Sequence, residues 1–382
     1  MEVGKYSIRL LFVGSLCTTN SFFSNFSYLS NLGSLSLIVN FDSEETEQML
    51  IKFYEYIEEV DYIQPDIYGL CSLGILLNYL SKVDKNRFKE YSEEFNTDFS
   101  DVILEASQAM EKKLEYDTFT GLVCTLNFFI LTGQKENSII VTDMLVRVTE
   151  QLYQENELDN LGLAHGVCGI IAVLAKAVLF LEKSEIKSNI LEKYKVTLER
   201  ITNHVIKQKG KIGNFCFPYT IGGKTSRLAW CYGDFSICIA LTWAALVLSN
   251  KKEIDEVVKY TIDNAINIKD EDRLFITNKE TEEFDLALCH GISGVYLVFK
   301  RLYEFYPSEK LQGEIERLKQ LLEREIKKGI ENIIFPVAIQ QEPLIFEWQS
   351  ELTFLNGLSG FLAAYHDDEL VKGWDAPLLL DF

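Results

Sequence analysis

The sequence predicts an all-α fold, an α/α toroid in which a ring of inner helices is sheathed by outer helices. The first supporting observation is a motif of one glycine, a second small or cysteine residue three positions later, and then a strongly apolar run. A motif repeated at intervals of this size is typical of an array of similar structural units. It occurs six times, and its first glycines are Gly69, Gly121, Gly166, Gly233, Gly291 and Gly357.

The second observation is that charged amphipathic stretches alternate with the apolar runs. A helix that is apolar on all sides is buried, and an amphipathic helix covers it. The small residues at the start of each apolar helix allow close backbone packing. The amphipathic stretches that predict outer helices include 43–60, 85–115, 182–209, 251–268 and 308–330.

The third observation concerns the connections. No Pro/Gly/Ser-rich linker interrupts the pattern, so residues 1–382 are expected to form one domain. Length alone would suggest two or three domains. Residues 1–42 are expected to be a degenerate repeat or a short extension, and 10–17 a buried strand rather than a signal peptide.

Longer connections precede the last three apolar runs. They are rich in turn-forming residues or in short aromatic and β-branched runs, which predicts loops rather than helices. Loops on one rim of a rigid ring are a usual place for a binding or catalytic site. The three segments are 210–226, 270–285 and 332–349.

The composition excludes several classes of protein. The chain has 382 residues, 47% of them hydrophobic, which is sufficient for a large core and excludes collagen-like and disordered classes. The formal net charge of −20 makes nucleic acid an unfavourable partner and favours cationic ones. The eight cysteines have no short-spaced framework, which indicates a reducing compartment. The weakly charged stretch 229–250 contains Asp234, so it fits a helix buried in protein better than a membrane span.

Two of the glycine motifs carry residues that could bind a metal. They are Trp230-Cys231-Tyr232-Gly233 and Cys289-His290-Gly291. Two thiolates and one imidazole with an open fourth position are typical of catalytic zinc. Neighbouring residues in a regular helix point about 100° apart, so Cys289 and His290 can share a metal only in an irregular helix start. The residues alone leave open the alternative of buried cysteines without a metal.

Three more side chains lie at the same predicted rim. His165 directly precedes Gly166 and is a candidate acid or base. Asp117, four residues before Gly121, is either a partner of that imidazole or a helix N-cap. Arg227 lies four residues before Cys231, in a loop. The other two histidines, His204 and His366, lie outside the motifs and are assigned no role.

The motifs Ala164-His165-Gly166, Trp230-Cys231-Tyr232-Gly233 and Cys289-His290-Gly291 together resemble those of the lanthipeptide cyclases, also called lanthionine synthetase C-like proteins. The resemblance covers about residues 43–366. It implies a toroid with one zinc ion (Zn²⁺) per chain at its mouth, held by Cys231, Cys289 and His290. It also implies functional positions at Asp117, His165, Arg227 and Tyr232.

The resemblance implies an activity as well. The family reaction is intramolecular addition of a precursor-peptide cysteine thiol to a dehydroalanine or dehydrobutyrine, which closes a lanthionine or methyllanthionine ring. The implied partners are a leader-bearing dehydrated peptide, a separate dehydratase and an export transporter. The implied location is the cytoplasm, at the inner membrane face when in complex. Two alternatives stay open, a glutathione-type thiol addition and a non-catalytic scaffold of a peptide-modifying complex.

The chain departs from the family pattern in two ways. Six motifs predict six helical hairpins where the family toroid has seven, and the degenerate seventh is expected within 22–41. Asp234 and Ser236 replace the small residues usual after the Trp-Cys-Tyr-Gly motif, a departure that concerns the shape of the pocket more than metal binding.

Overall fold

The computed structural model of the chain contains a ring of helices. It describes residues 35, 39–40, 42–59, 67–183, 188–273, 277–278, 283–341, 344–351 and 353–382. The predicted strand at 10–17 and nearly all of the predicted seventh hairpin at 22–41 lie outside the described residues.

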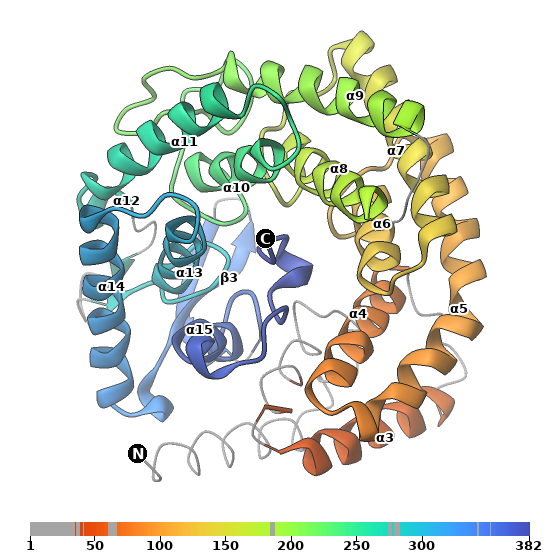
Figure 1. The fold of residues 1–382 in the computed structure, drawn as a ribbon. Coiled ribbons are helices and arrows are strands. Elements are labelled where there is room, and N and C mark those ends of the chain that lie inside the picture. Colours follow the sequence, from red (N-terminus) through yellow and green to blue (C-terminus); the bar gives the residue numbers. More distant parts are fainter. Residues whose placement is uncertain are drawn as a thin grey trace.

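Two concentric layers of helices make up the ring, and the chain follows it in order (Figure 1). The inner helices are α4 (Ile67–Val83), α6 (Leu122–Leu131), α8 (Val167–Glu182), α10 (Asp234–Ala245), α13 (Ile292–Tyr303) and α15 (Leu358–Tyr365). The outer helices are α3 (Ser43–Glu59), α5 (Lys85–Lys113), α7 (Lys135–Glu155), α9 (Ser188–Ile206), α11 (Lys251–Ile266) and α14 (Glu309–Lys327). The predicted α/α toroid is therefore confirmed.

Burial separates the two layers as the hydrophobic pattern requires. Every residue of α10 is buried, whereas α14 buries only five of its 19 residues. An apolar helix gains from burial on all sides, and an amphipathic helix leaves its charged face in water. The six apolar runs of the sequence thus became the inner helices.

A repeated turn starts five of the inner helices. In each, the first helical N–H donates to the carbonyl oxygen of the residue seven positions earlier. This bond closes a loop that reverses the chain between an outer and an inner helix. The five bonds are Leu122 N to Glu115 O, Val167 N to Asn160 O, Asp234 N to Arg227 O, Ile292 N to Asp285 O and Leu358 N to Glu351 O.

The repeated small residues are needed where this turn touches the helix start. A Cβ atom at Gly291 would lie 2.5 Å from the Asp285 carbonyl oxygen, and one at Gly294 would lie 2.0 Å from the Leu288 carbonyl oxygen. Real Cβ atoms do not approach this closely. The first motif differs from the prediction, because Gly69 lies inside α4 rather than at its cap.

Gly294 provides a test of this packing. Replacing Gly294 with alanine is expected to destabilise the protein by about 2–3 kcal/mol, because the backbone has to shift away from the added methyl group. The matched control is Gly313→Ala in α14, where a Cβ meets nothing within 4 Å. That variant is expected to gain about 0.5–1 kcal/mol from helix propensity. Urea unfolding measures both, and equal stabilities of the two variants would contradict the steric explanation.

The longer connections only partly match the prediction of loops. Residues 210–226 contain turns and isolated bridges and no helix, as predicted. The segment 270–285 begins with a helical turn, α12 (Asp270–Arg273), and has two short paired strands, β1 (Thr277–Asn278) and β2 (Glu283–Phe284).

The prediction of a loop was wrong for 332–349. After the short η2 (Ile330–Asn332), β3 (Phe335–Gln341) pairs antiparallel with β4 (Leu344–Gln349). Aromatic and β-branched residues in two adjacent runs favour a hairpin.

The C-terminal segment lies in the middle of the ring (Figure 1). It includes the short helices η3 (Asp367–Glu369) and η4 (Ala376–Leu378). Side chains of three inner helices and one helix-start turn reach its backbone or its carboxylate. These contacts are Asn127 to the Ala376 carbonyl, Trp230 to that of Leu378, Trp243 to that of Leu379, and Lys176 to Asp381.

Two further predictions concern the described residues. The seven described cysteines are free thiols, as expected without a disulfide framework. Among the described helices, none is long and apolar enough to cross a membrane. Within 229–250 the helix α10 has 12 residues and is buried in the protein, which agrees with the prediction.

Candidate active site

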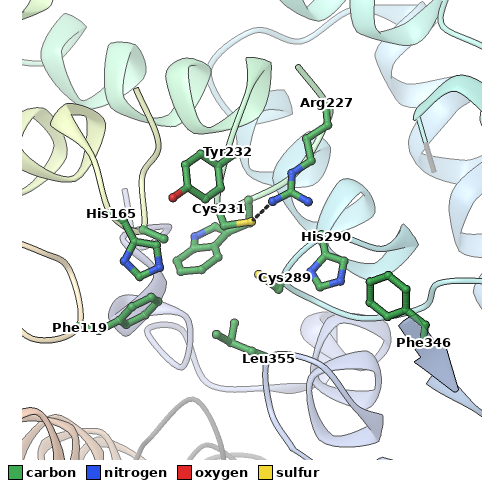
Figure 2. A pocket seen from close by; sticks show the side chains of 11 residues that line it. Phe119, His165, Arg227, Cys231, Tyr232, Cys289, His290, Phe346 and Leu355 are labelled. Atoms are coloured by element: carbon green, nitrogen blue, oxygen red, sulfur yellow. Dashed lines mark hydrogen bonds between the residues drawn. The ribbon is translucent and has the colours of Figure 1, made fainter. Parts of the chain in front are cut away.

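A pocket of about 560 Å³ opens where the turns before the inner helices converge. Five of these turns and the strand β4 contribute to its walls, so residues far apart in the chain meet there (Figure 2). The lining residues are Phe119, Ala164, His165, Arg227, Trp230, Cys231, Tyr232, Cys289, His290, Phe346 and Leu355. Six of the seven predicted site residues are in this set, and the seventh, Asp117, contacts His165.

Cys231 and Cys289 bring their thiols together from the turns before α10 and α13. Cys231 is 5% exposed. Its pKa is lowered to about 7, first by the hydrogen bond with the Cys289 thiol and then by the nearby Arg227 guanidinium, against the opposing effect of burial. The same hydrogen bond raises the pKa of Cys289. The pair therefore favours one thiolate and one thiol.

His290 lines the same pocket as the two cysteines (Figure 2). It belongs to the turn that precedes α13, so Cys289 and His290 occupy the irregular helix start that shared binding requires. The Nε2 atom of His290 lies 3.2 Å from Oδ2 of Asp285, whose side chain is fully buried. Burial lowers the pKa of His290, so its neutral form, the one that binds metals, is favoured.

Arg227 lies against two tyrosine rings and next to Cys231. Its Cζ atom is 5.3 Å from the ring centre of Tyr219 and 5.5 Å from that of Tyr232. Its Nη2 atom donates to the Cys231 sulfur at 3.3 Å. Stacking on aromatic faces restricts a guanidinium to few orientations, so the charge of Arg227 is held at the pocket wall.

His165 and Asp117 form an ion pair at the opposite wall. Nδ1 of His165 lies 2.5 Å from Oδ2 of Asp117. This hydrogen bond and the charge of Asp117 raise the pKa of His165, although partial burial opposes the shift. The imidazole side chain is 46% exposed, so it is accessible from the pocket.

The alternative prediction of a helix N-cap was wrong for Asp117, because Gly121 is the cap residue of α6, and the carboxylate instead closes the turn before the helix. Its Oδ1 atom accepts the backbone N–H groups of Phe119, at 2.6 Å, and Thr120, at 3.3 Å. The two oxygens therefore serve two purposes, one holding the turn and the other holding His165.

The donor chemistry of the pocket fits a zinc ion, although the side chains are not gathered as a finished metal site. Among the residues that the structure describes, no group of three histidine, cysteine or carboxylate side chains qualifies as a metal cluster as it stands. Cys231, Cys289 and His290 nevertheless line one pocket. The Oδ2 atom of Asp285 is buried without a hydrogen-bond partner, and a carboxylate behind a histidine is typical of zinc sites.

Asp234 and Ser236, which follow the Trp-Cys-Tyr-Gly motif, do not line the pocket. The carboxylate of Asp234 is buried and accepts the backbone N–H groups of Cys216 and Phe217. The hydroxyl of Ser236 donates to the Trp230 carbonyl oxygen at 2.8 Å, so it holds the turn together.

Three residues that line the pocket, and Asp285 behind His290, were missed in the sequence. Phe119 and Leu355 belong to the turns before α6 and α15, and their places within the turns could have indicated them. Phe346 comes from β4, which nothing local connects with the pocket. Asp285 lies six residues before Gly291, the same place in its turn as Asn160 before Gly166. His204, in α9, and His366, after α15, do not line the pocket.

Comparison with known proteins places this fold and pocket in a family. Residues 41–370 match the family described as lanthionine synthetase C-like protein. The nisin biosynthesis protein NisC of Lactococcus lactis subsp. lactis is 26% identical over 49% of this chain and 50% of that protein. The chain thus matches about half the length of this curated relative.

A solved structure of nisin cyclase has the same fold. It matches with a TM-score of 0.69 and 16% sequence identity, over 100% of this chain and 98% of that chain. At this identity the match concerns the fold alone. The family match, which extends over most of the sequence and includes the pocket residues, shows that this chain belongs to the lanthionine synthetase C-like family.

Proposed function

We propose that this chain is a zinc-dependent lanthipeptide cyclase, which adds precursor-peptide cysteine thiols to dehydroalanine or dehydrobutyrine. The observation that carries the proposal is the convergence of Cys231, Cys289 and His290 with an arginine and a histidine–aspartate pair in one pocket. The family match and the likeness to nisin cyclase support it.

Cys231, Cys289 and His290 would hold the metal in this proposal. A bound zinc ion supplies Lewis acidity, which lowers the pKa of a substrate thiol so that it reacts as a thiolate. The two cysteine thiolates would offset the charge of the metal, so that a substrate thiolate would stay nucleophilic. The resulting thiolate is the nucleophile that the addition requires.

Arg227 stabilises the charge that the addition creates. When the sulfur bonds to the β-carbon of the dehydro residue, the double-bond electrons move to the carbonyl and form an enolate. A guanidinium held against the rings of Tyr219 and Tyr232, beside Cys231, is already oriented toward this region. A preorganised cation stabilises developing negative charge without reorganising during the reaction.

His165 donates the proton that completes the reaction. The imidazolium transfers its proton to the α-carbon of the enolate, and the neutral ring recovers one from the solvent or from the next substrate thiol. Asp117 keeps the ring charged before the transfer and fixes its orientation. Protonation from a single wall sets the stereochemistry of the new centre.

Apolar walls would select how the peptide enters the pocket. Phe119, Trp230, Phe346 and Leu355 line it, and Tyr232 lies next to His165 with ring centres 6.3 Å apart. The same thiol and alkene can react unaided, so positioning by these walls is needed to select one ring and one stereochemistry. A leader-bearing peptide, a separate dehydratase and an export transporter at the inner membrane face complete the proposed cytoplasmic context.

The test is ring closure in a defined peptide. A synthetic peptide with one dehydroalanine and one cysteine is incubated with the purified zinc-loaded protein. Loss of the free thiol, counted by alkylation and mass spectrometry, reports the addition, and chiral analysis of the hydrolysed product reports its stereochemistry. We expect faster closure than without protein and a single stereoisomer. Addition of external glutathione instead of ring closure would support the glutathione alternative, and no addition with retained zinc would support the scaffold.

The pH dependence of ring closure tests the acid. The pKa of His165 lies above its ordinary value of 6.5, so its acid form persists to higher pH and the rate falls only above this raised value. In Asp117→Asn, the side-chain amide oxygen can still accept the N–H groups of the turn, but the negative charge beside His165 is lost. The pKa of His165 is then lower, so the decrease in rate begins at a lower pH. Glu115→Gln is the control, because the Glu115 carboxylate forms a surface ion pair with the exposed Lys113 and does not line the pocket. An unchanged pH profile in Asp117→Asn would exclude this acid.

A further inference from the structure

The two carboxylate oxygens of Asp285 have different surroundings. One accepts a hydrogen bond within a turn, and the other faces His290. Its Oδ1 atom accepts the backbone N–H of Ala287 at 2.8 Å, and its carbonyl oxygen accepts that of Ile292 at 2.9 Å. The Oδ2 atom lies 3.2 Å from Nε2 of His290. The side chain is fully buried, and Oδ2 has no hydrogen-bond partner.

In two of the other four repeats, the side chain at the equivalent position closes the same turn, which provides an internal comparison. Asn160 and Glu351 occupy the equivalent position, six residues before the cap glycine. The Oδ1 atom of Asn160 accepts the Gly162 N–H at 2.9 Å, and the Oε1 atom of Glu351 accepts the Thr353 N–H at 3.0 Å. One side-chain oxygen is sufficient for the turn, and an amide serves as well as a carboxylate. The turn therefore does not explain the second oxygen of Asp285.

A buried carboxylate oxygen has a high desolvation cost unless a donor faces it. The imidazole of His290 faces this oxygen. A histidine that binds a metal through one ring nitrogen generally donates the N–H of the other nitrogen to a carboxylate or carbonyl. This contact fixes the tautomer and the direction of the ring.

We infer that Asp285 is a positioning residue, which directs the imidazole of His290 so that its Nδ1 atom, rather than Nε2, serves as the metal ligand. The inference rests on the proposed zinc site. It assigns to Asp285 a role that neither Asn160 nor Glu351 has, although all three close the same turn.

The first test is the zinc affinity of Asp285→Asn, measured by competition with a chromophoric chelator in protein prepared without metal. Asparagine keeps the turn, as Asn160 does, and removes the anionic oxygen that faces His290. We expect zinc binding about 10- to 100-fold weaker than in the unmodified protein. Glu351→Gln removes one charge from the equivalent turn and is expected to keep the original affinity. Unchanged affinity in Asp285→Asn would overturn the inference.

A double-mutant cycle separates positioning from a general structural effect. If Asp285 acts through His290, then Asp285→Asn weakens metal binding in the unmodified chain and has no effect in a His290→Ala background. Cadmium, which thiolates bind strongly, is the probe for this weaker site. An equal loss of metal affinity in the two backgrounds would overturn the inference. A variant whose metal-free form unfolds at a lower temperature while its metal affinity is unchanged would also overturn it. An unmodified protein that binds no zinc would overturn the proposed function itself.

Discussion

Replacing Cys289 with alanine is expected to remove zinc from the protein and to slow ring closure at least about 10³-fold. Two protein ligands would remain, Cys231 and His290. Loss of several kcal/mol of Lewis-acid stabilisation corresponds to a rate loss of this size, because each 1.36 kcal/mol is tenfold. Elemental analysis of the purified protein measures the zinc, and the peptide assay measures the rate.

The matched control for this prediction is Cys168→Ala. Cys168 is fully buried in α8, outside the pocket, and burial keeps its pKa far above neutral, so it stays protonated. This variant is expected to keep one zinc ion per chain and most of the activity. A Cys289→Ala protein that kept its zinc would exclude Cys289 as a ligand. A protein that lost the zinc but closed rings at the original rate would exclude the zinc-thiolate mechanism.

Arg301→Met is expected to cost about 3–5 kcal/mol of folding stability, the largest stability effect we expect from a single charged residue. Arg301 lies in α13 with its side chain 14% exposed, between two nearly buried carboxylates. Its Nε atom donates to Asp375 at 2.7 Å, and its two terminal nitrogens donate to Asp367 at 2.8 and 2.5 Å. Methionine fills a similar volume but leaves these carboxylates without their main cation.

The control is Arg324→Met, on the outer helix α14. Arg324 is 54% exposed and contacts Glu325 at 3.0 Å, so its loss is expected to cost less than about 1 kcal/mol. Urea unfolding of both variants at neutral pH measures the difference. A loss in Arg301→Met as small as that in Arg324→Met would show that the cluster does not stabilise the ring.

The pH dependence gives an additional check on the same cluster. Burial alone would raise the pKa of Asp367, but the hydrogen bonds and charges of Arg301 and Lys300 lower it to about 2. A carboxyl group with a lowered pKa in the folded state stabilises above its unfolded pKa of about 3.9 and loses this contribution as the pH falls toward 2. The difference between the unmodified protein and Arg301→Met should therefore decrease over this range.

Much of the ring could be predicted from the sequence because its causes are local. An apolar or amphipathic period determines which layer a helix occupies, and the turn before each inner helix needs small residues within a few positions of its own backbone, as at Gly291 and Gly294. The hairpin at 335–349 was missed because short aromatic runs between turn residues fit a loop as well as paired strands.

The candidate site was also predictable only in part. The motifs themselves indicated four of the site residues, because each lies one or two positions before a helix-start glycine: Cys231, Cys289, His290 and His165. The contact between Asp285 and His290, the wall formed by Phe346 and the C-terminal segment inside the ring were not predicted.

The sequence by itself determined the helices, their order around the ring and the rim where the reactive side chains lie. Only the tertiary structure decided which oxygen faces His290, which side chains close the pocket and what fills the centre of the ring. The physical reason is that hydrophobic periodicity acts along one helix, and the steric limits on a turn act between residues a few positions apart. Contacts such as that of Trp230 with Leu378, 148 residues apart, depend on how the whole ring closes.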